Sequence, residues 1–331
     1  MTQVAVTQSP ISTLQSPTPP PVRTSAPTAA TIGKSEFTPC SGYNATAPDG
    51  QPQSGYGPWA SRLLLAFSDD GLTFTPANQS LADQADVPDA ITTPDGEIRV
   101  YFIIMCPEEV RNRIVVAVSR DAVTWAYKKT LLTGMDDLIA MAVDPTVERT
   151  PEGKWRLFFT SAPRDANSES ARSYSAISDD GFNFAREEGE RFAAEGQLVL
   201  DPNVLLIGET WHYFAGGVPG SNHHATSSDG LNFTRAKNFV MENILMANGL
   251  AVDGGYRYYG FVQDQRDGSS YIRSLFTADG VTWTVDPGNR LELNASNGLE
   301  SVGVKDPAVT RLPDGRYLMV YATIIPGYPT P

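Results

Sequence analysis

The sequence predicts an all-β protein, a five-bladed β-propeller with four antiparallel strands in each blade. The first observation is a turn phrase that occurs five times, with an acidic residue at its third position: Asp70, Asp121, Asp180, Asp229 and Asp279. The second is the spacing of these residues, which is 51, 59, 49 and 50. The third is a strand-forming phrase between successive turns. A period near 50 residues built of short strands is typical of a propeller.

Each turn phrase has the form Ser68-Asp69-Asp70-Gly71-Leu72-Thr73-Phe74, with Ser or Thr first, Asp third, usually Gly fourth and an aromatic residue last. We expect the Asp carboxylate and the Ser hydroxyl to accept backbone N–H groups of their own turn. The Gly suits the positive φ that such a turn requires. The five repeated Asp residues are therefore predicted to be structural.

The strand-forming phrase consists of a short apolar stretch with an Asp-Pro step, a Gly-containing turn and an alternating aromatic run. We call its two strands A and B, and we call C and D the strands before and after each Asp turn. The chain begins with a C–D pair at about 61–77 and ends with an A–B pair at about 303–324. Pairing of these segments would complete one shared blade, close the ring and remove exposed sheet edges.

Composition divides the chain into a spacer at 1–36, predicted to be disordered, and a propeller domain at 37–331. The spacer is rich in Pro, Ser and Thr and almost lacks large apolar residues, so it cannot bury enough surface to fold. Such a spacer resembles the tether of a secreted or lipid-anchored bacterial surface protein. We therefore expect a bacterial extracellular, cell-surface or periplasmic location.

The formal net charge of −13 argues against nucleic acid as a partner, because nucleic-acid binding requires a basic surface. No apolar run approaches the 18 residues of a membrane span. We expect a monomer. The two cysteines, Cys40 and Cys106, either form a disulfide that ties the N-terminal extension to the propeller or remain two buried thiols.

The Asp turns resemble the Asp-boxes of sialidases, shortened by one residue between Asp and Gly. Five repeats, with no recognisable set of arginines, argue against a sialidase. The Asp-Pro entry to strand A, as in Val143-Asp144-Pro145 and Lys305-Asp306-Pro307, resembles the five-bladed glycoside hydrolases of family 43 and their relatives. The resemblance covers about 56–325. It implies hydrolysis of a glycosidic bond by carboxyl groups, with no organic cofactor.

That family places a general base Asp in the first blade and an orienting Asp in the second. By position, the resemblance implies Asp86 or Asp89 as the base and Asp144 as the orienting residue. The residue before the strand-A proline defines a slot that Asp144, Asp201 and Asp306 share, and we assign Asn248 to the same slot in the fourth A strand. Carboxyl groups that converge at one channel mouth raise one another's pKa values.

The resemblance also implies an acidic Glu in a later blade. Glu195, Glu242 and Glu300 each lie six residues before a slot residue, in the loop that enters strand A. We favour Glu195 as the catalytic acid, with Glu242 next. The residues predicted to contact the substrate are Asp201, Asn248, Asp306, His223, Glu242 and Glu300.

Two alternatives stay open. An Asp before Pro often accepts local backbone bonds, so the slots could recur only because the repeat was duplicated. A ring of carboxylates could also hold a structural Ca²⁺ in the channel. The predicted function is hydrolysis of an extracellular poly- or oligosaccharide, and the alternative is a non-catalytic carbohydrate-binding propeller at the cell surface. The slots differ between blades, which favours the enzyme.

Overall fold

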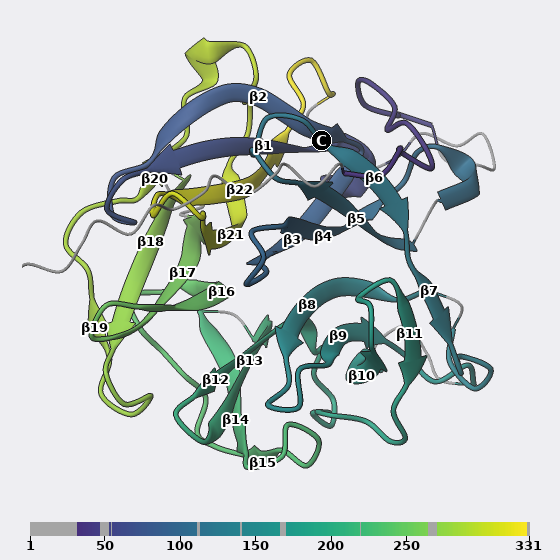
Figure 1. Cartoon of the computed structure of the whole chain (residues 1–331), viewed down its shortest axis with the longest axis vertical. Coiled ribbons are helices and arrows are strands. Elements are labelled where there is room, and N and C mark those ends of the chain that lie inside the picture. The colour runs from purple at the N-terminus through teal and green to yellow at the C-terminus, as the bar shows by residue number, and fades with distance from the viewer. Residues whose placement is uncertain are drawn as a thin grey trace, which may run out of the picture. The chain divides into compact units, whose positions relative to one another are not determined.

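The computed structural model describes residues 32–46, 53, 55–110, 113–139, 141–165, 170–218, 220–263 and 270–329. Residues 1–31, most of the predicted spacer, lie outside the described residues. From Ile32 onward the chain forms one compact unit. Its strands form five small sheets arranged around a common axis (Figure 1). The prediction of an all-β, five-bladed propeller is confirmed.

Blades I and II follow the predicted A-B-C-D order. Blade I consists of β3 (Ala85–Thr92), β4 (Ile98–Ile104), β5 (Arg113–Ser119) and β6 (Ala126–Lys129). Blade II consists of β8 (Val143–Arg149), β9 (Trp155–Ser161), β10 (Arg172–Ser178) and β11 (Asn183–Arg186). The linker between them adds a fifth strand, because β7 (Leu131–Thr133) pairs in parallel with β11.

Blades III and IV repeat the arrangement with short D strands. Blade III consists of β12 (Leu200–Ile207), β13 (Thr210–Val218), β14 (Ser221–Ser227) and β15 (Thr234–Arg235). Blade IV consists of β16 (Leu245–Val252), β17 (Gly255–Gln263), β18 (Ser270–Thr277) and β19 (Thr284–Val285), and β20 (Leu291–Glu292) also pairs with β18.

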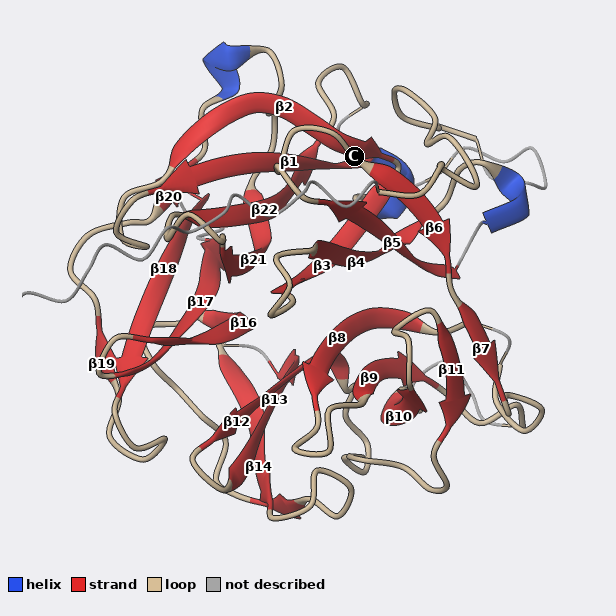
Figure 2. Ribbon diagram, in the orientation of Figure 1, coloured by secondary structure: helices blue, strands red, loops and turns tan. Residues whose placement is uncertain are grey.

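Blade V closes the ring as the sequence predicts. The C-terminal strands β21 (Val304–Arg311) and β22 (Tyr317–Ile324) pair with the N-terminal strands β1 (Ser61–Ser68) and β2 (Thr75–Asp83), in the order β2-β1-β22-β21 (Figure 2). Three short 3₁₀ helices lie in the described loops: η1 (Pro58–Ala60), η2 (Glu108–Val110) and η3 (Ala295–Asn297). None of the described helices has the length and apolarity required to cross a membrane.

The Asp turns bond as predicted. In the first turn, Asp70 Oδ1 accepts the backbone N–H groups of Leu72 and Thr73 at 2.7 and 2.8 Å, and Ser68 Oγ accepts that of Gly71 at 2.9 Å. The other four turns repeat these bonds. These carboxylates serve the fold, as the sequence indicated.

The hydrophobic core lies between the blades. Each of five buried clusters joins one blade to the next. Polar contacts strengthen some of these joints, because B-strand side chains donate to the Asp turn of the following blade. Tyr101 donates to the carbonyl of Gly181 at 2.9 Å, and Tyr259 donates to that of Gly71 at 2.8 Å. The blades therefore hold the A strands in fixed positions around the axis.

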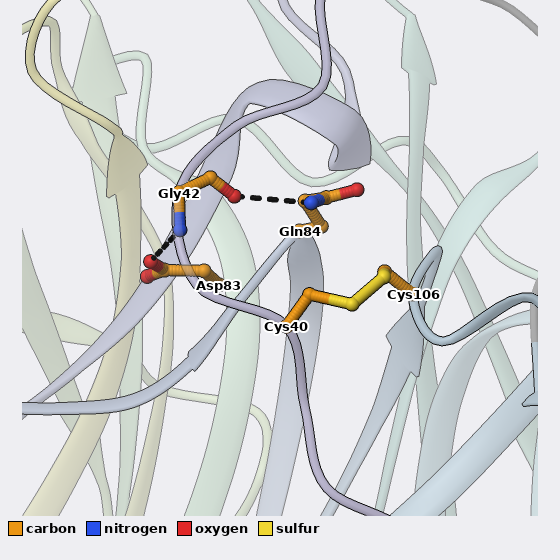
Figure 3. The surroundings of a disulfide bond; sticks show 5 residues. All are labelled: Cys40, Gly42, Asp83, Gln84 and Cys106. Atoms are coloured by element: carbon orange, nitrogen blue, oxygen red, sulfur yellow. Dashed lines mark hydrogen bonds between the residues drawn. A yellow bond between two sulfur atoms is a disulfide. The ribbon is translucent and has the colours of Figure 1, made fainter.

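The described N-terminal segment is bonded to blades V and I. Cys40 and Cys106 form a disulfide, which settles the alternative that the sequence left open (Figure 3). Beside it, Gly42 N–H donates to Asp83 at 2.6 Å, and Gln84 Nε2 donates to the Gly42 carbonyl at 3.1 Å. Glu36 N–H donates to the carbonyl of Tyr127 in β6, so the last residues assigned to the spacer lie along the propeller.

Candidate active site

The A strands share one local distortion near their starts. In all five, the register with strand B shifts at a bulge, and in four of them the bulge contains the strand-A proline. Proline suits a bulge because it has no N–H group to pair. The residue before it has a positive φ between 48° and 56° in each case: Val87, Asp144, Asp201 and Asp306. The slot defined from the sequence is therefore one backbone position that recurs in four blades, and in blade I Val87 occupies it.

The register also corrects the assignment of Asn248. The first residue to pair with strand B after each bulge is Asp89, Thr146, Asn203, Asn248 or Ala308. Asn248 therefore lies in the layer of Asp89 and not in the slot of Asp144. Asp86 lies before the bulge, in the position that Lys305 occupies in blade V. The fourth A strand lacks the proline, so the sequence alone did not fix this alignment.

Four acidic side chains meet at the end of the axis where the A strands begin. Lys305 Nζ forms ion pairs with Asp86 Oδ1 at 2.6 Å and with Asp306. Asp201 N–H donates to Asp144 Oδ2 at 3.2 Å. We call Asp86, Asp144, Asp201, Lys305 and Asp306 the mouth cluster. Its four acidic members come from four blades, three of them from the slot and Asp86 from the position just before it.

Burial and nearby charges raise the pKa values of several groups in the mouth cluster. Burial, with the nearby charges of Asp306 and Asp86, raises the pKa of Asp144 to about 6. Burial and the charge of Asp144 raise the pKa of Asp201 well above its ordinary value. Burial lowers the pKa of Lys305, but the two carboxylates beside it outweigh that effect and raise it. The site therefore combines an ammonium group with carboxyl groups that hold their protons to a higher pH than ordinary carboxyl groups do.

Lys305 was missed in the sequence interpretation. It directly precedes Asp306, at a position where blades II and III have the apolar residues Val143 and Leu200. A basic residue at a position that is apolar in blades II and III and acidic in blade I was the available signal. Ser61 was also missed, and its hydroxyl donates to Asp86 Oδ2 at 3.0 Å.

One layer further along the axis, polar side chains connect neighbouring A strands. Asp89 Oδ2 accepts from Val147 N at 2.7 Å, and Asn248 Oδ1 accepts from Val309 N at 2.8 Å. Asn248 Nδ2 also donates to Asp89 Oδ1 at 2.9 Å. Thr146 and Asn203 donate to carbonyl groups of the next A strand, those of Pro202 and Ala247. We call Asp89, Thr146, Asn203 and Asn248 the channel belt.

Asp89 and Asp86 consequently belong to different layers. Asp89 and Asn248 line a cavity of about 340 Å³ formed by the second halves of the A strands, together with Glu148. Burial raises the pKa of Asp89 to about 6 and, with the charge of Asp89, raises that of Glu148 well above its ordinary value. Of the two candidate bases, Asp86 is the one that the structure places with Asp144.

The three candidate glutamates do not join the mouth cluster. Glu195 is exposed and lines a separate cavity with Arg172 and Glu190. Glu242 is exposed and pairs with Arg273 at 3.1 Å. Glu300 is 1% exposed and accepts hydrogen bonds from Tyr321, Asn297 and the backbone of Asn294, so it holds a loop in place.

His223 lies inside β14 and is fully buried, with Nε2 3.1 Å from the carbonyl oxygen of Leu198 and its ring against Phe192. Its neighbour His224 stacks on Phe214 with ring centroids 4.6 Å apart. Across the part of the chain that the structure describes, no three His, Cys, Asp or Glu side chains are grouped to hold a metal ion. The calcium ion considered from the sequence stays a prediction.

No protein-family model and no curated protein matches the chain. Solved structures do match its fold. A thermostable family-43 glycoside hydrolase is 15% identical, with a TM-score of 0.54, over 72% of this chain and 89% of its own. An N-acetylgalactosamine deacetylase from F. plautii, in complex with blood group B trisaccharide, is 12% identical, with a TM-score of 0.55, over 82% of this chain and 100% of its own.

A glycosyl hydrolase from Bacteroides ovatus is 14% identical, with a TM-score of 0.53, over 74% of this chain and 85% of its own. The five-bladed fold of the family-43 enzymes, named above as a resemblance, is therefore shared. At these identities the likeness concerns the fold, and function has to be argued from the site.

Proposed function

We propose that the chain is a glycoside hydrolase and that the mouth cluster is its catalytic centre. The observation that carries the proposal is the meeting of Asp86, Asp144, Asp201 and Asp306 around Lys305. Hydrolysis of a glycosidic bond requires one carboxyl group that donates a proton to the leaving oxygen and a second that activates water or attacks the sugar. Neither role needs an organic cofactor.

The roles follow from the surroundings of each carboxyl group. Lys305 and Ser61 fix the orientation of Asp86, which we assign as the base or nucleophile. Asp144 accepts the backbone N–H of Asp201, and its charge raises the pKa of Asp201. Both interactions suit a residue that orients and tunes its neighbour. Asp201 has a raised pKa and lines an open cavity. We therefore assign the proton donor to Asp201, with Glu195 kept as the competing prediction.

The mouth cluster also limits the substrate. Four acidic side chains face one basic side chain, so an anionic sugar would be repelled. We propose a neutral oligo- or polysaccharide. A location outside the cytoplasm is supported by the Cys40–Cys106 disulfide, because such bonds persist in oxidising compartments.

The test is release of reducing sugar from a panel of neutral plant, algal and bacterial polysaccharides. We expect wild-type activity to fall at least 100-fold in Asp144→Asn and in Asp201→Asn, while Glu195→Gln retains it. Loss of activity in Glu195→Gln and retention in Asp201→Asn would return the acid role to Glu195.

Acetate release is measured in the same reactions, because a carbohydrate deacetylase shares this fold. Release of acetate without reducing sugar would show that the chain is a carbohydrate esterase or amidase and not a glycosidase. Binding of one glycan with neither product would support the carbohydrate-binding alternative.

A further inference from the structure

A cavity of about 280 Å³ opens beside Asp201, between blades III and IV. Backbone of three glycines, Gly216, Gly217 and Gly220, forms one part of its lining. The apolar side chains of Leu245, Met246 and Phe261 form another part. Asp201 is the residue that this cavity shares with the mouth cluster, so a ligand there would contact both.

The two adjacent glycines have different reasons to be glycine. Gly217 has a φ of +105°, and a Cβ atom there would lie 2.1 Å from the carbonyl oxygen of Leu198. The backbone therefore requires glycine at 217. A Cβ atom on Gly216 would lie 3.6 Å from both Asp201 Oδ2 and the Leu200 carbonyl oxygen, which is ordinary contact. The fold tolerates a side chain at 216, and its absence keeps the space beside Asp201 open.

The lining has a defined chemistry. Among the residues that the structure describes, the lining contains one carboxyl group, three large apolar side chains and no basic side chain. A sulfate or carboxylate would lose its hydration there without a cationic partner. A hydroxyl group can bond Asp201, and an apolar group gains from contact with Leu245 and Phe261.

We propose that this cavity binds a neutral sugar that carries a methyl group, with a ring hydroxyl on Asp201 and the methyl group on Leu245, Met246 and Phe261. This inference rests on the proposed function, because it extends the site of the same Asp201. The methyl group can be C6 of a 6-deoxy sugar or the end of a 2-acetamido group, and the test separates the two sources.

The experiment is saturation-transfer NMR and titration with the full-length protein. The probes are galactose, glucose and mannose, each compared with its 6-deoxy and its 2-acetamido form. We expect one methyl-bearing form to bind at least tenfold more tightly than its parent sugar, with the strongest saturation on its methyl protons. The sugar that shows this effect identifies the source of the methyl group.

Gly216→Ala should remove this preference, because its methyl group would fill the space beside Asp201. Gly33→Ala is the matched control, since Gly33 also lacks a positive φ and its nearest neighbour is the flexible end of Lys128. If Gly216→Ala lowers the melting temperature, Leu245→Asn at a half-buried position replaces it.

Equal binding of methyl-bearing and parent sugars, no binding of any sugar, or a preference that survives in both cavity variants would overturn the proposal. Hydrolysis assays on the same protein separate the two hypotheses. A methyl preference without hydrolysis contradicts the proposed function alone. Hydrolysis without the preference contradicts this inference alone.

Discussion

The mouth cluster and the channel belt each take residues from four of the five A strands, a few residues apart along the chain, yet their polar side chains have different partners. In the channel belt, the side chains bond the neighbouring A strand, and Asn248 uses both atoms of its amide. In the mouth cluster, the acidic side chains face one another around a single ammonium group, and burial raises the pKa values of three of them.

This difference in partners indicates that the channel belt stabilises the fold and that the mouth cluster serves function. Buried polar groups that are fully paired hold a structure in one arrangement. Buried like charges work against folding, and such costs concentrate where chemistry needs them. If this comparison holds, substitutions in the belt should change stability alone, and substitutions of acidic residues in the mouth cluster should change activity and stability in opposite directions.

The largest effect is expected from Lys305→Met. Removing one partner of a buried ion pair costs about 3–5 kcal/mol, and here two carboxylates, those of Asp86 and Asp306, lose their cation. The loss should be greatest at pH 7 and smaller near pH 4, because burial raises the pKa of Asp306 and so favours its uncharged form as the pH falls. Thermal unfolding across this range measures it.

The control is the double variant Lys305→Met with Asp306→Asn, which leaves one fewer unpaired charge and should recover part of the stability. A Lys305→Met protein as stable as wild type at pH 7 would show that the ammonium group does not hold the cluster together.

The next largest effect tests the belt. Asn248→Ala leaves Val309 N–H and Asp89 Oδ1 without their partner, and each unsatisfied buried group costs about 1–3 kcal/mol. We expect a loss of at least about 2 kcal/mol by urea denaturation, with kcat unchanged on any substrate found.

Asn203→Ala is the graded comparison, because Asn203 makes one such bond, to the Ala247 carbonyl. It should cost less than Asn248→Ala. A fall in activity with unchanged stability in Asn248→Ala would return Asn248 to the substrate-binding residues, where the sequence interpretation placed it.

The third prediction concerns Asp144→Asn. Because the pKa of Asp144 is about 6 in the folded protein and the ordinary pKa of an Asp is 3.8, the folded protein binds a proton that the unfolded chain has already lost. The wild-type protein should therefore lose stability as the pH rises from about 4 to about 6. The raised pKa of Asp144 corresponds to at most about 3 kcal/mol of folding stability.

Asp144→Asn should be more stable than wild type above pH 6, equally stable below pH 4 and inactive. Melting temperatures at pH 4, 5, 6 and 7 measure the difference, with Asp70→Asn as an acidic control whose pKa is lowered by its turn. If Asp144→Asn is less stable than wild type at pH 7, the charge of Asp144 does not destabilise the mouth cluster.

The sequence predicts the fold better than it predicts the site, for a physical reason. The Asp turns depend on local bonds such as those of Asp70, so their spacing specifies the blades and the closure of the ring. The site depends on the bulges, and one extra residue moves every later side chain to the other face of the strand. This shift separated Asp86 from Asp89 and moved Asn248 out of the slot.

The loops are less predictable still. The position of Glu195 depends on the path of a loop that no period encodes, and Lys305 differs from its counterparts in the repeat. Asp144, Asp201 and Asp306, which share the slot in the structure as the sequence indicates, are the residues that an adjacent proline marks.

The smallest effect is expected at the slot of blade I. Val87 has a φ of 48°, a conformation that Asp tolerates better than a β-branched residue and that costs roughly 1–2 kcal/mol for ordinary side chains. Val87→Asn should therefore stabilise the protein by about 1 kcal/mol and keep the N–H donated to Asp86.

The matched control is Val143→Asn, since Val143 is also half-buried but has no positive φ; it loses apolar contact without relief of strain and should lower the melting temperature. If Val87→Asn and Val143→Asn lower the melting temperature equally, the backbone at Val87 stores no strain. The slots of blades I and II would then differ only in their side chains. If Val87→Asn is more stable but slower, the strain at Val87 helps to orient Asp86 toward the substrate.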